Sequence, residues 1–93
     1  MPELRRQVTI VNELGLHARA AAKLVQIASR SPVELQIGHD EMMVNAKSIM
    51  GVLMLAASKG TELQLVATGD EEPALAALEA LVALIQDRFG EGR

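Results

Sequence analysis

Hydrophobic and polar residues follow two different periods along the chain, and the switches between these periods divide it into strands and helices. Alternation at every second residue predicts strands over residues 5–11, 33–37, 42–44 and 63–67. Apolar residues spaced three to four apart predict helices over residues 18–29, 48–57 and 69–89. The predicted order is therefore strand, helix, strand, strand, helix, strand, helix.

Turn-forming residues mark the joints between these elements. Ser31-Pro32 ends the first helix, and Lys59-Gly60 ends the second. Residues 38–41 predict a turn that makes residues 33–44 a hairpin, with His39 as a solvated turn residue. Residues 90–93 are interpreted as a short polar tail.

Each predicted strand has one polar face, and each predicted helix has an apolar stripe. This pattern favours two layers, in which helices cover one side of a four-stranded sheet. A chain of 93 residues that is 49% apolar is long enough for one modest core, so we expect a single α+β domain over residues 1–93. Phe89 is the one aromatic residue, and the rest of the core must be aliphatic.

Composition excludes several classes of function. The absence of cysteine rules out disulfides and thiolate metal sites, and two histidines far apart in sequence make a weak case for zinc. A net charge of −3 and the lack of Trp and Tyr disfavour nucleic-acid binding. No apolar run approaches the ~20 residues of a membrane span and no signal peptide opens the chain, so we expect a cytoplasmic protein.

The charges are unevenly placed along the sequence. Seven of the nine Lys and Arg residues lie in residues 1–60, whereas seven of the twelve Asp and Glu residues lie in residues 61–93. This polarity favours steering of an acidic partner toward the first part of the chain, although a generic acidic tail gives the same count.

His17 is the residue most suggestive of chemistry. It lies where the first strand gives way to the first helix, next to unpaired first-turn amides and the positive end of the helix dipole. Arg19 adds a planar guanidinium suited to phosphate or carboxylate. An imidazole, free amides and a guanidinium around one point predict a phosphoryl-carrying histidine. The ordinary alternative is a surface residue or a weak helix cap.

The second helix, over residues 48–57, is apolar on nearly every side. A short helix on an open sheet buries one stripe, which we assign to Val52, Leu55 and Ala56. The remaining apolar residues would then form an exposed docking surface, unless the helix is more buried than this arrangement implies. This predicted docking patch consists of Ile49, Met50 and Leu53.

Three motifs together resemble a known family. Residues 15–19 (Gly-Leu-His-Ala-Arg), residues 44–52 and residues 59–63 are similar in order and spacing to HPr. HPr is the histidine-containing phosphocarrier family of the bacterial phosphoenolpyruvate-dependent phosphotransferase system. The resemblance covers nearly the whole chain and implies an open-faced sandwich of four antiparallel strands and three helices on one face.

The resemblance implies a role for each residue of the first motif. His17 would accept a phosphoryl group from enzyme I through Nδ1 and pass it to a IIA protein. The phosphate oxygens would meet the amides of Ala18 and Arg19 and the Arg19 side chain. The chain would act as a phosphocarrier rather than a stand-alone enzyme, as a monomer without metal or organic cofactor.

The second motif implies partner binding and regulation. Ser48 matches the serine modified by HPr kinase/phosphorylase in some bacteria; its ordinary alternative is a helix N-cap contributing about 1 kcal/mol. Ile49, Met50 and Leu53 match the family's docking patch.

One position departs from the family pattern. Many members have proline after the motif arginine, where this chain has Ala20, which resembles proteobacterial forms that include the nitrogen-branch homologue NPr. Sugar and nitrogen branches both stay open. The alternative function is a non-catalytic HPr-like regulator that binds proteins while His17 stays unused.

Overall fold

The computed structural model describes residues 2–39 and 41–93 and confirms the predicted order of elements. None of the helices in these residues is long and apolar enough to cross a membrane. The elements are β1 (Glu3–Thr9), α1 (Ala18–Ser29), β2 (Glu34–His39), β3 (Met42–Asn45), α2 (Ile49–Met54), β4 (Glu62–Thr68), α3 (Glu71–Gln86) and a 3-10 turn, η1 (Arg88–Gly90).

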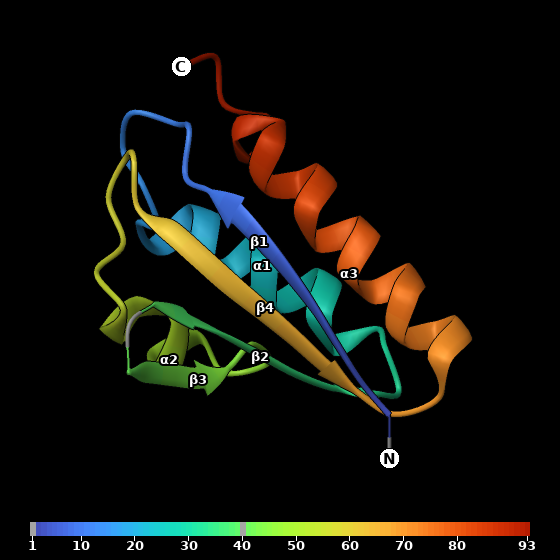
Figure 1. The fold of residues 1–93 in the computed structure, drawn as a ribbon. Coiled ribbons are helices and arrows are strands. Elements are labelled where there is room, and N and C mark those ends of the chain that lie inside the picture. Colours follow the sequence, from blue (N-terminus) through green and yellow to red (C-terminus); the bar gives the residue numbers. More distant parts are fainter. Residues whose placement is uncertain (1, 40) are drawn as a thin grey trace.

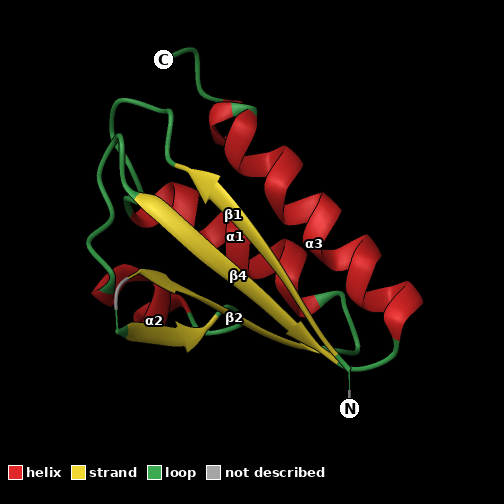
Figure 2. Cartoon of the chain, in the orientation of Figure 1, coloured by secondary structure: helices red, strands yellow, loops and turns green. Residues whose placement is uncertain are grey.

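The four strands form one antiparallel sheet in the order β1-β4-β2-β3. The strands make one layer and the helices lie on one face of it, as Figure 2 shows. This arrangement confirms the predicted open-faced, two-layer α+β fold. β1 and β4 pair along their full lengths, from Glu3 opposite Thr68 to Thr9 opposite Glu62.

The core lies between the sheet and the helices and is almost entirely aliphatic. Leu63 and Leu65 of β4 are fully buried because they lie in a central strand, on the face of the sheet that the helices cover. Alternate residues of the strands face the helices, as the period of two requires. The helices contribute Leu24 and Ala28 from α1, Val52 from α2, and Ala74, Leu78, Leu81 and Ile85 from α3.

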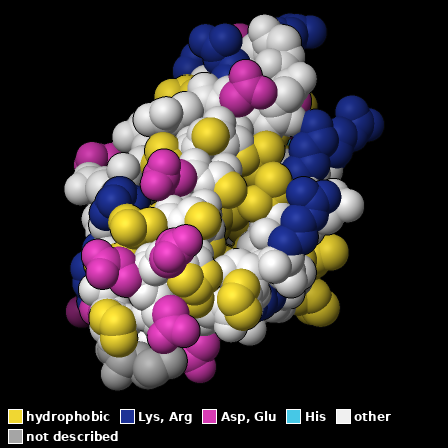
Figure 3. Space-filling view, turned by 90° about the vertical axis from the view of Figure 1, so that its right-hand side faces the viewer, with side chains coloured by type: hydrophobic (Ala, Val, Ile, Leu, Met, Phe, Trp, Pro, Cys, Tyr) yellow, Lys and Arg dark blue, Asp and Glu magenta, His cyan; other side chains and the backbone are white. Residues whose placement is uncertain are grey.

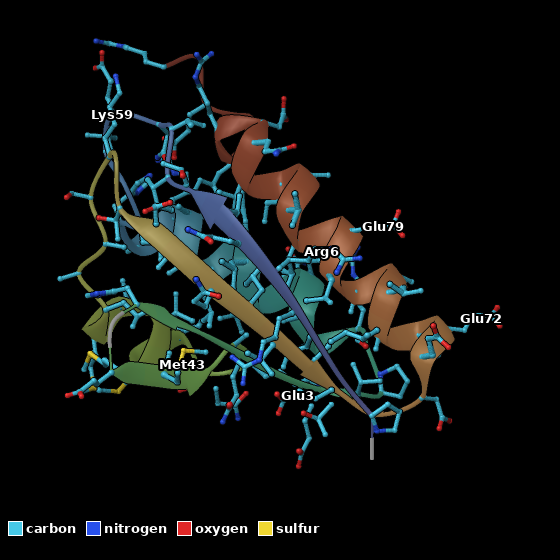
Figure 4. All side chains as sticks on the ribbon, in the orientation of Figure 1. Glu3, Arg6, Met43, Lys59, Glu72 and Glu79 are labelled. Atoms are coloured by element: carbon cyan, nitrogen blue, oxygen red, sulfur yellow. The ribbon has the colours of Figure 1, made fainter. Side chains whose placement is uncertain are left out.

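The surface on the α3 side carries its basic and acidic side chains in different places. Hydrophobic side chains run between a row of Lys and Arg on one side and scattered Asp and Glu on the other (Figure 3). Glu72 and Glu79 project from α3 into solvent (Figure 4). These acidic side chains therefore make the outer face of α3 polar.

Two predicted element boundaries are wrong near the N-terminus and the hairpin. The first strand was expected over residues 5–11 but is Glu3–Thr9, because its ladder with β4 ends opposite Glu62. His39 was expected in a solvated turn but ends β2, where it is half-buried and its Nε2 lies 3.1 Å from the Leu55 carbonyl oxygen. Asp40 lies outside the described residues.

The second helix is shorter than predicted, Ile49–Met54 rather than residues 48–57. The amides of Leu55 and Ala56 bond to carbonyls three residues back, which tightens and ends the helix. Ala56 then takes a left-handed conformation, with φ of 48°. It is exposed and does not face the sheet, so its predicted burial is wrong, whereas that of Val52 and Leu55 is confirmed.

The third helix ends at Gln86, three residues before the predicted limit at Phe89. Arg88 and Phe89 both have left-handed backbones, with φ of 57° and 56°. This conformation is uncommon for residues with side chains and persists where surrounding contacts compensate for it. Here the Phe89 side chain is fully buried in the core.

The burial of Phe89 turns the C-terminal segment back over the molecule. The Lys23 ammonium donates to the Phe89 carbonyl at 2.6 Å, and the Glu13 amide donates to the Arg93 carbonyl at 3.2 Å. The chain end therefore lies beside the loop between β1 and α1 (Figure 1). Residues 90–93 are polar, as predicted, but they are packed against this loop.

We expect Phe89→Ala to lower the free energy of unfolding by about 3–5 kcal/mol, because it removes a fully buried ring and leaves a cavity. Phe89→Leu, which keeps most of the apolar volume, should lose clearly less. Urea unfolding of both variants and the parent measures the difference. Equal stability of Phe89→Ala and the parent would contradict the anchoring role of this side chain.

Candidate functional site

The position of His17 is set by a close backbone contact two residues earlier. Gly15 has φ of +65°, and a Cβ there would lie 2.4 Å from the Ala57 carbonyl oxygen. The Leu16 amide donates to that same oxygen at 2.8 Å. Only glycine combines this backbone conformation with this approach. The contact ties the loop before α1 to the segment after α2 and determines where α1 begins.

His17 is the N-cap residue of α1, as predicted. Its backbone is extended, with φ of −73° and ψ of 176°, and its carbonyl accepts from the Ala21 amide at 2.8 Å. Its side chain makes no capping hydrogen bond. The amides of Ala18, Arg19 and Ala20 have no partner within the helix, because the first turn of an α-helix lacks preceding carbonyls. An anion beside His17 would meet these donors and the positive end of the dipole.

The imidazole of His17 contacts a carboxylate from the C-terminal segment. His17 Nε2 and Glu91 Oε2 are hydrogen-bonded, and the two side chains are 27% and 16% exposed. The other carboxylate oxygen of Glu91 accepts from Asn12 Nδ2 at 2.9 Å, and Asn12 Nδ2 also donates to the Gly15 carbonyl at 3.0 Å. Both oxygens of Glu91 are therefore held by donors from the loop between β1 and α1.

These contacts stabilise the charged form of Glu91. Burial of the carboxyl raises its pKa, but the hydrogen bonds with His17 and Asn12 and the charges of His17 and Lys23 outweigh it. The net pKa of Glu91 is below its ordinary value of 4.5. The carboxylate is therefore ionised at neutral pH and can only accept hydrogen bonds.

A hollow of about 260 Å³ opens beside His17 and Glu91. Its charges are mixed, because Arg19 and Arg93 face Glu13 and Glu91. Arg93 and Glu13 approach to 3.9 Å across its exposed rim. The sequence interpretation of a basic surface around His17 is thus incomplete, since the fold brings an acid of the C-terminal half into it. The lining residues are Glu13, Leu14, His17, Arg19, Glu91, Gly92 and Arg93.

The predicted docking patch is exposed. Ile49, Met50 and Leu53 are all solvent-accessible, and Met50 is 75% exposed. Sequence reasoning did not single out two other apolar side chains, Met54 and Leu14, which are 63% and 71% exposed. Met54 is the last residue of α2, and Leu14 lies in the loop before α1.

Ser48 is the N-cap of α2, which confirms its structural alternative. Its Oγ accepts from the Gly51 amide at 3.1 Å. The residue is half-buried and adjoins Ile49 of the docking patch.

Sequence reasoning missed Asn12 and Glu91 as site residues. Asn12 is fully buried and, within the described residues, its Oδ1 has no hydrogen-bond partner. A polar residue in a predicted turn gave no reason to expect burial. Glu91 lay in a predicted polar tail, and nothing in its local sequence indicates a contact with His17, 74 residues away.

Comparison with known proteins identifies the family. The sequence model described as "PTS HPr component phosphorylation site" matches residues 4–87. The chain belongs to the HPr family. It is thus of the phosphocarrier type that forms part of the phosphotransferase system.

Relatives in this family match over their whole length. The phosphocarrier protein HPr of Pseudomonas aeruginosa is 54% identical, with 99% of each chain covered. The phosphocarrier protein NPr of Shewanella violacea is 45% identical, with 98% of each chain covered. The crystal structure of HPr-C-His from Thermoanaerobacter tengcongensis superposes with a TM-score of 0.87 at 44% identity, covering all of both chains. The resemblance seen in the sequence motifs is confirmed.

Because the pKa of Glu91 is lowered in the folded state, its carboxylate stabilises the fold at pH values above the ordinary value near 4.5. This contribution is lost as pH falls through the lower, folded-state pKa. We expect the stability difference between the parent and Glu91→Gln to be largest at pH 7 and to shrink progressively below pH ~4.5.

Urea unfolding at a series of pH values measures this difference. Glu79→Gln, which removes a carboxylate that projects from α3 into solvent (Figure 4), is the matched control and should show no such trend. A Glu91→Gln difference that stays constant from pH 7 to pH 3 would contradict the role of the Glu91 charge.

Proposed function

We propose that Nδ1 of His17 accepts a phosphoryl group from the phosphohistidine of enzyme I and later passes it to a IIA protein. The observation that carries this proposal is the position of His17 at the N-cap of α1, with its side chain not used for capping. The family's phosphorylation-site model spans this residue, which supports the same assignment.

The transfer needs no change in the number of protons on the imidazole. The lone pair of Nδ1 forms the new nitrogen–phosphorus bond while the bond to the donor's histidine nitrogen breaks, and that electron pair returns to the donor ring. The reverse sequence delivers the group to the IIA protein. Catalysis is then mostly positioning and electrostatics in a desolvated interface.

Ala18 and Arg19 are proposed to hold the phosphate oxygens. Their amides lie in the first turn of α1, where no intrahelical carbonyl accepts from them. The exposed guanidinium of Arg19 lines the same hollow as His17 and adds a charge-assisted contact. Because the site lies at the surface, these contacts stabilise the phosphoryl group and still allow its release. We propose no metal or organic cofactor for this step.

The docking patch is proposed to bind enzyme I and the IIA protein in turn. Exposed Met and Leu side chains suit a surface that must fit more than one partner, since methionine adapts its shape. The interface should be small and transient. We propose that the chain acts as a monomer and as a single domain over residues 1–93. The proposed location is the cytoplasm, in a sugar-uptake or nitrogen-branch pathway.

Ser48 is proposed as the regulatory site, modified by HPr kinase/phosphorylase where that enzyme is present. A phosphate there adds about −1.5 to −2 charges beside the docking patch. The free amides at the start of α2 would tolerate it, but the partner would have to desolvate it.

We expect His17→Ala to abolish phosphate uptake from enzyme I and phosphoenolpyruvate while the protein remains folded, because the side chain is half-buried at the surface. The measurement is the acid-labile, base-stable gain of one phosphate, with circular dichroism to confirm folding. A phosphohistidine in His17→Ala would assign the carrier role to His39. No phosphate on the parent would favour the non-catalytic regulator.

We expect Ser48→Asp to keep or raise the melting temperature, since aspartate is also a good N-cap. In the reaction with enzyme I, the KM for this chain should rise about tenfold, which corresponds to ~1.4 kcal/mol of weaker binding. Ser48→Asn caps without charge and is the matched control, which should behave as the parent. Unchanged kinetics in a stable Ser48→Asp variant would show that enzyme I docks elsewhere.

A further inference from the structure

We propose that Glu91 is a positioning residue for His17: its carboxylate accepts the Nε2 proton and leaves Nδ1 as the unprotonated, nucleophilic nitrogen. The tautomer part of this inference rests on the contact between the two side chains. Its consequence for phosphoryl transfer rests on the proposed function of His17.

The pattern of donors around Glu91 determines the direction of the hydrogen bond. An ionised carboxylate offers acceptors only, so the proton between Glu91 Oε2 and His17 must belong to Nε2. Asn12 Nδ2 donates to the second oxygen and prevents rotation of the carboxylate away from the ring. In a neutral imidazole that carries its proton on Nε2, Nδ1 has the free lone pair.

The C-terminal segment is built to hold this carboxylate in place. The segment is anchored by the buried ring of Phe89 and by the Lys23 ammonium on the Phe89 carbonyl. Its end is tied to the loop before α1 by the bond between the Glu13 amide and the Arg93 carbonyl. Glu91 lies between these two attachments, so its side chain reaches His17 from a fixed backbone.

Glu91 also responds to the charge that develops during transfer. When the Nδ1 lone pair bonds to phosphorus and the donor's nitrogen–phosphorus bond breaks, His17 retains its Nε2 proton and its ring gains positive charge. A carboxylate on Nε2 stabilises that charge, as a carboxylate paired with a histidine does in hydrolases. Arg19, which lines the same hollow, and the first-turn amides of α1 are available for the negative charge of the phosphoryl group.

The competing explanation is that Glu91 merely fastens the chain end. A fastening role predicts a lower melting temperature in Glu91 variants and no effect on the ring or on the chemical step. A positioning role predicts changes in both. Two experiments distinguish the fastening role from the positioning role: one observes the His17 ring directly, and the other measures kcat and KM separately.

The first experiment records two-bond ¹H–¹⁵N spectra of unphosphorylated protein at a pH where His17 is neutral. In the parent we expect one slowly exchanging Nε2 proton and well-separated shifts for the two ring nitrogens. In Glu91→Ala the proton should exchange rapidly with water, and the two ¹⁵N shifts should move toward each other as the Nδ1–H form is populated. Identical spectra in a folded Glu91→Ala variant would overturn the proposal, even if its melting temperature falls.

The second experiment measures phosphoryl transfer from phosphorylated enzyme I. Glu91→Ala should lower kcat about tenfold with KM unchanged, the size expected for loss of one hydrogen bond to a charged group. Glu91→Gln, which keeps a neutral acceptor for the Nε2 proton, should fall between Glu91→Ala and the parent. Glu79→Gln on the outer face of α3 is the charge control and should match the parent.

Failure of this inference differs from failure of the proposed function. If the parent takes up no phosphate on histidine, the proposed function fails while the spectra still test the Glu91 contact. If the parent is phosphorylated and Glu91→Ala transfers with the same kcat, the positioning role is overturned and His17 remains the carrier.

Discussion

The backbone contact between residues 15–16 and Ala57 is the constraint on which the site depends. It joins the loop that leads into α1 to the segment that leaves α2, so the start of one helix and the end of the other are fixed together. The unpaired amides beside His17 and the exposed side chains of α2 consequently have a fixed relation. A site that transfers a group between proteins needs such a relation, because the docking surface must deliver the donor to the acceptor atom.

Two segments far apart in sequence meet at His17: the joint between β1 and α1, and the C-terminal segment. The loop before α1 supplies Asn12, the helix start supplies His17 and Arg19, and the chain end supplies Glu91. The resulting balance of charges suits a carrier. On the proposed function, the positive groups would attract the phosphoryl group, and the carboxylate of Glu91 would stabilise the charge that develops on the imidazole ring.

The exposed apolar side chains of α2 follow from the architecture. A sheet covered on one face offers a six-residue helix only one buried stripe, here Val52 with Leu55 just after the helix. Ile49, Met50 and Leu53 are left in solvent. The protein tolerates this exposure because its core is supplied by α1, α3 and the sheet. Exposed apolar patches of this kind are typical of surfaces that bind other proteins. Ser48 caps the same helix and adjoins Ile49, so a charge added there would lie beside these exposed side chains.

Sequence periodicity was sufficient for the order of elements, the two-layer fold, the N-cap position of His17 and the exposure of Ile49, Met50 and Leu53. These features depend on residues near one another in the chain, where apolar spacing and turn residues determine the local structure. The motif resemblance supplied the family for the same reason, since Gly15, His17 and Arg19 lie within five consecutive residues of one joint.

Only the tertiary structure decided the ends of the elements and the second half of the site. β1 stops where β4 stops, and α2 stops where Ala57 must meet Leu16; both limits depend on distant partners. Glu91 reaches His17 because Phe89, in an unfavourable left-handed backbone, is held by burial in a core that forms from the whole chain. No local pattern encodes that burial, and so the sequence alone predicted a tail where the folded protein has a partner for its histidine.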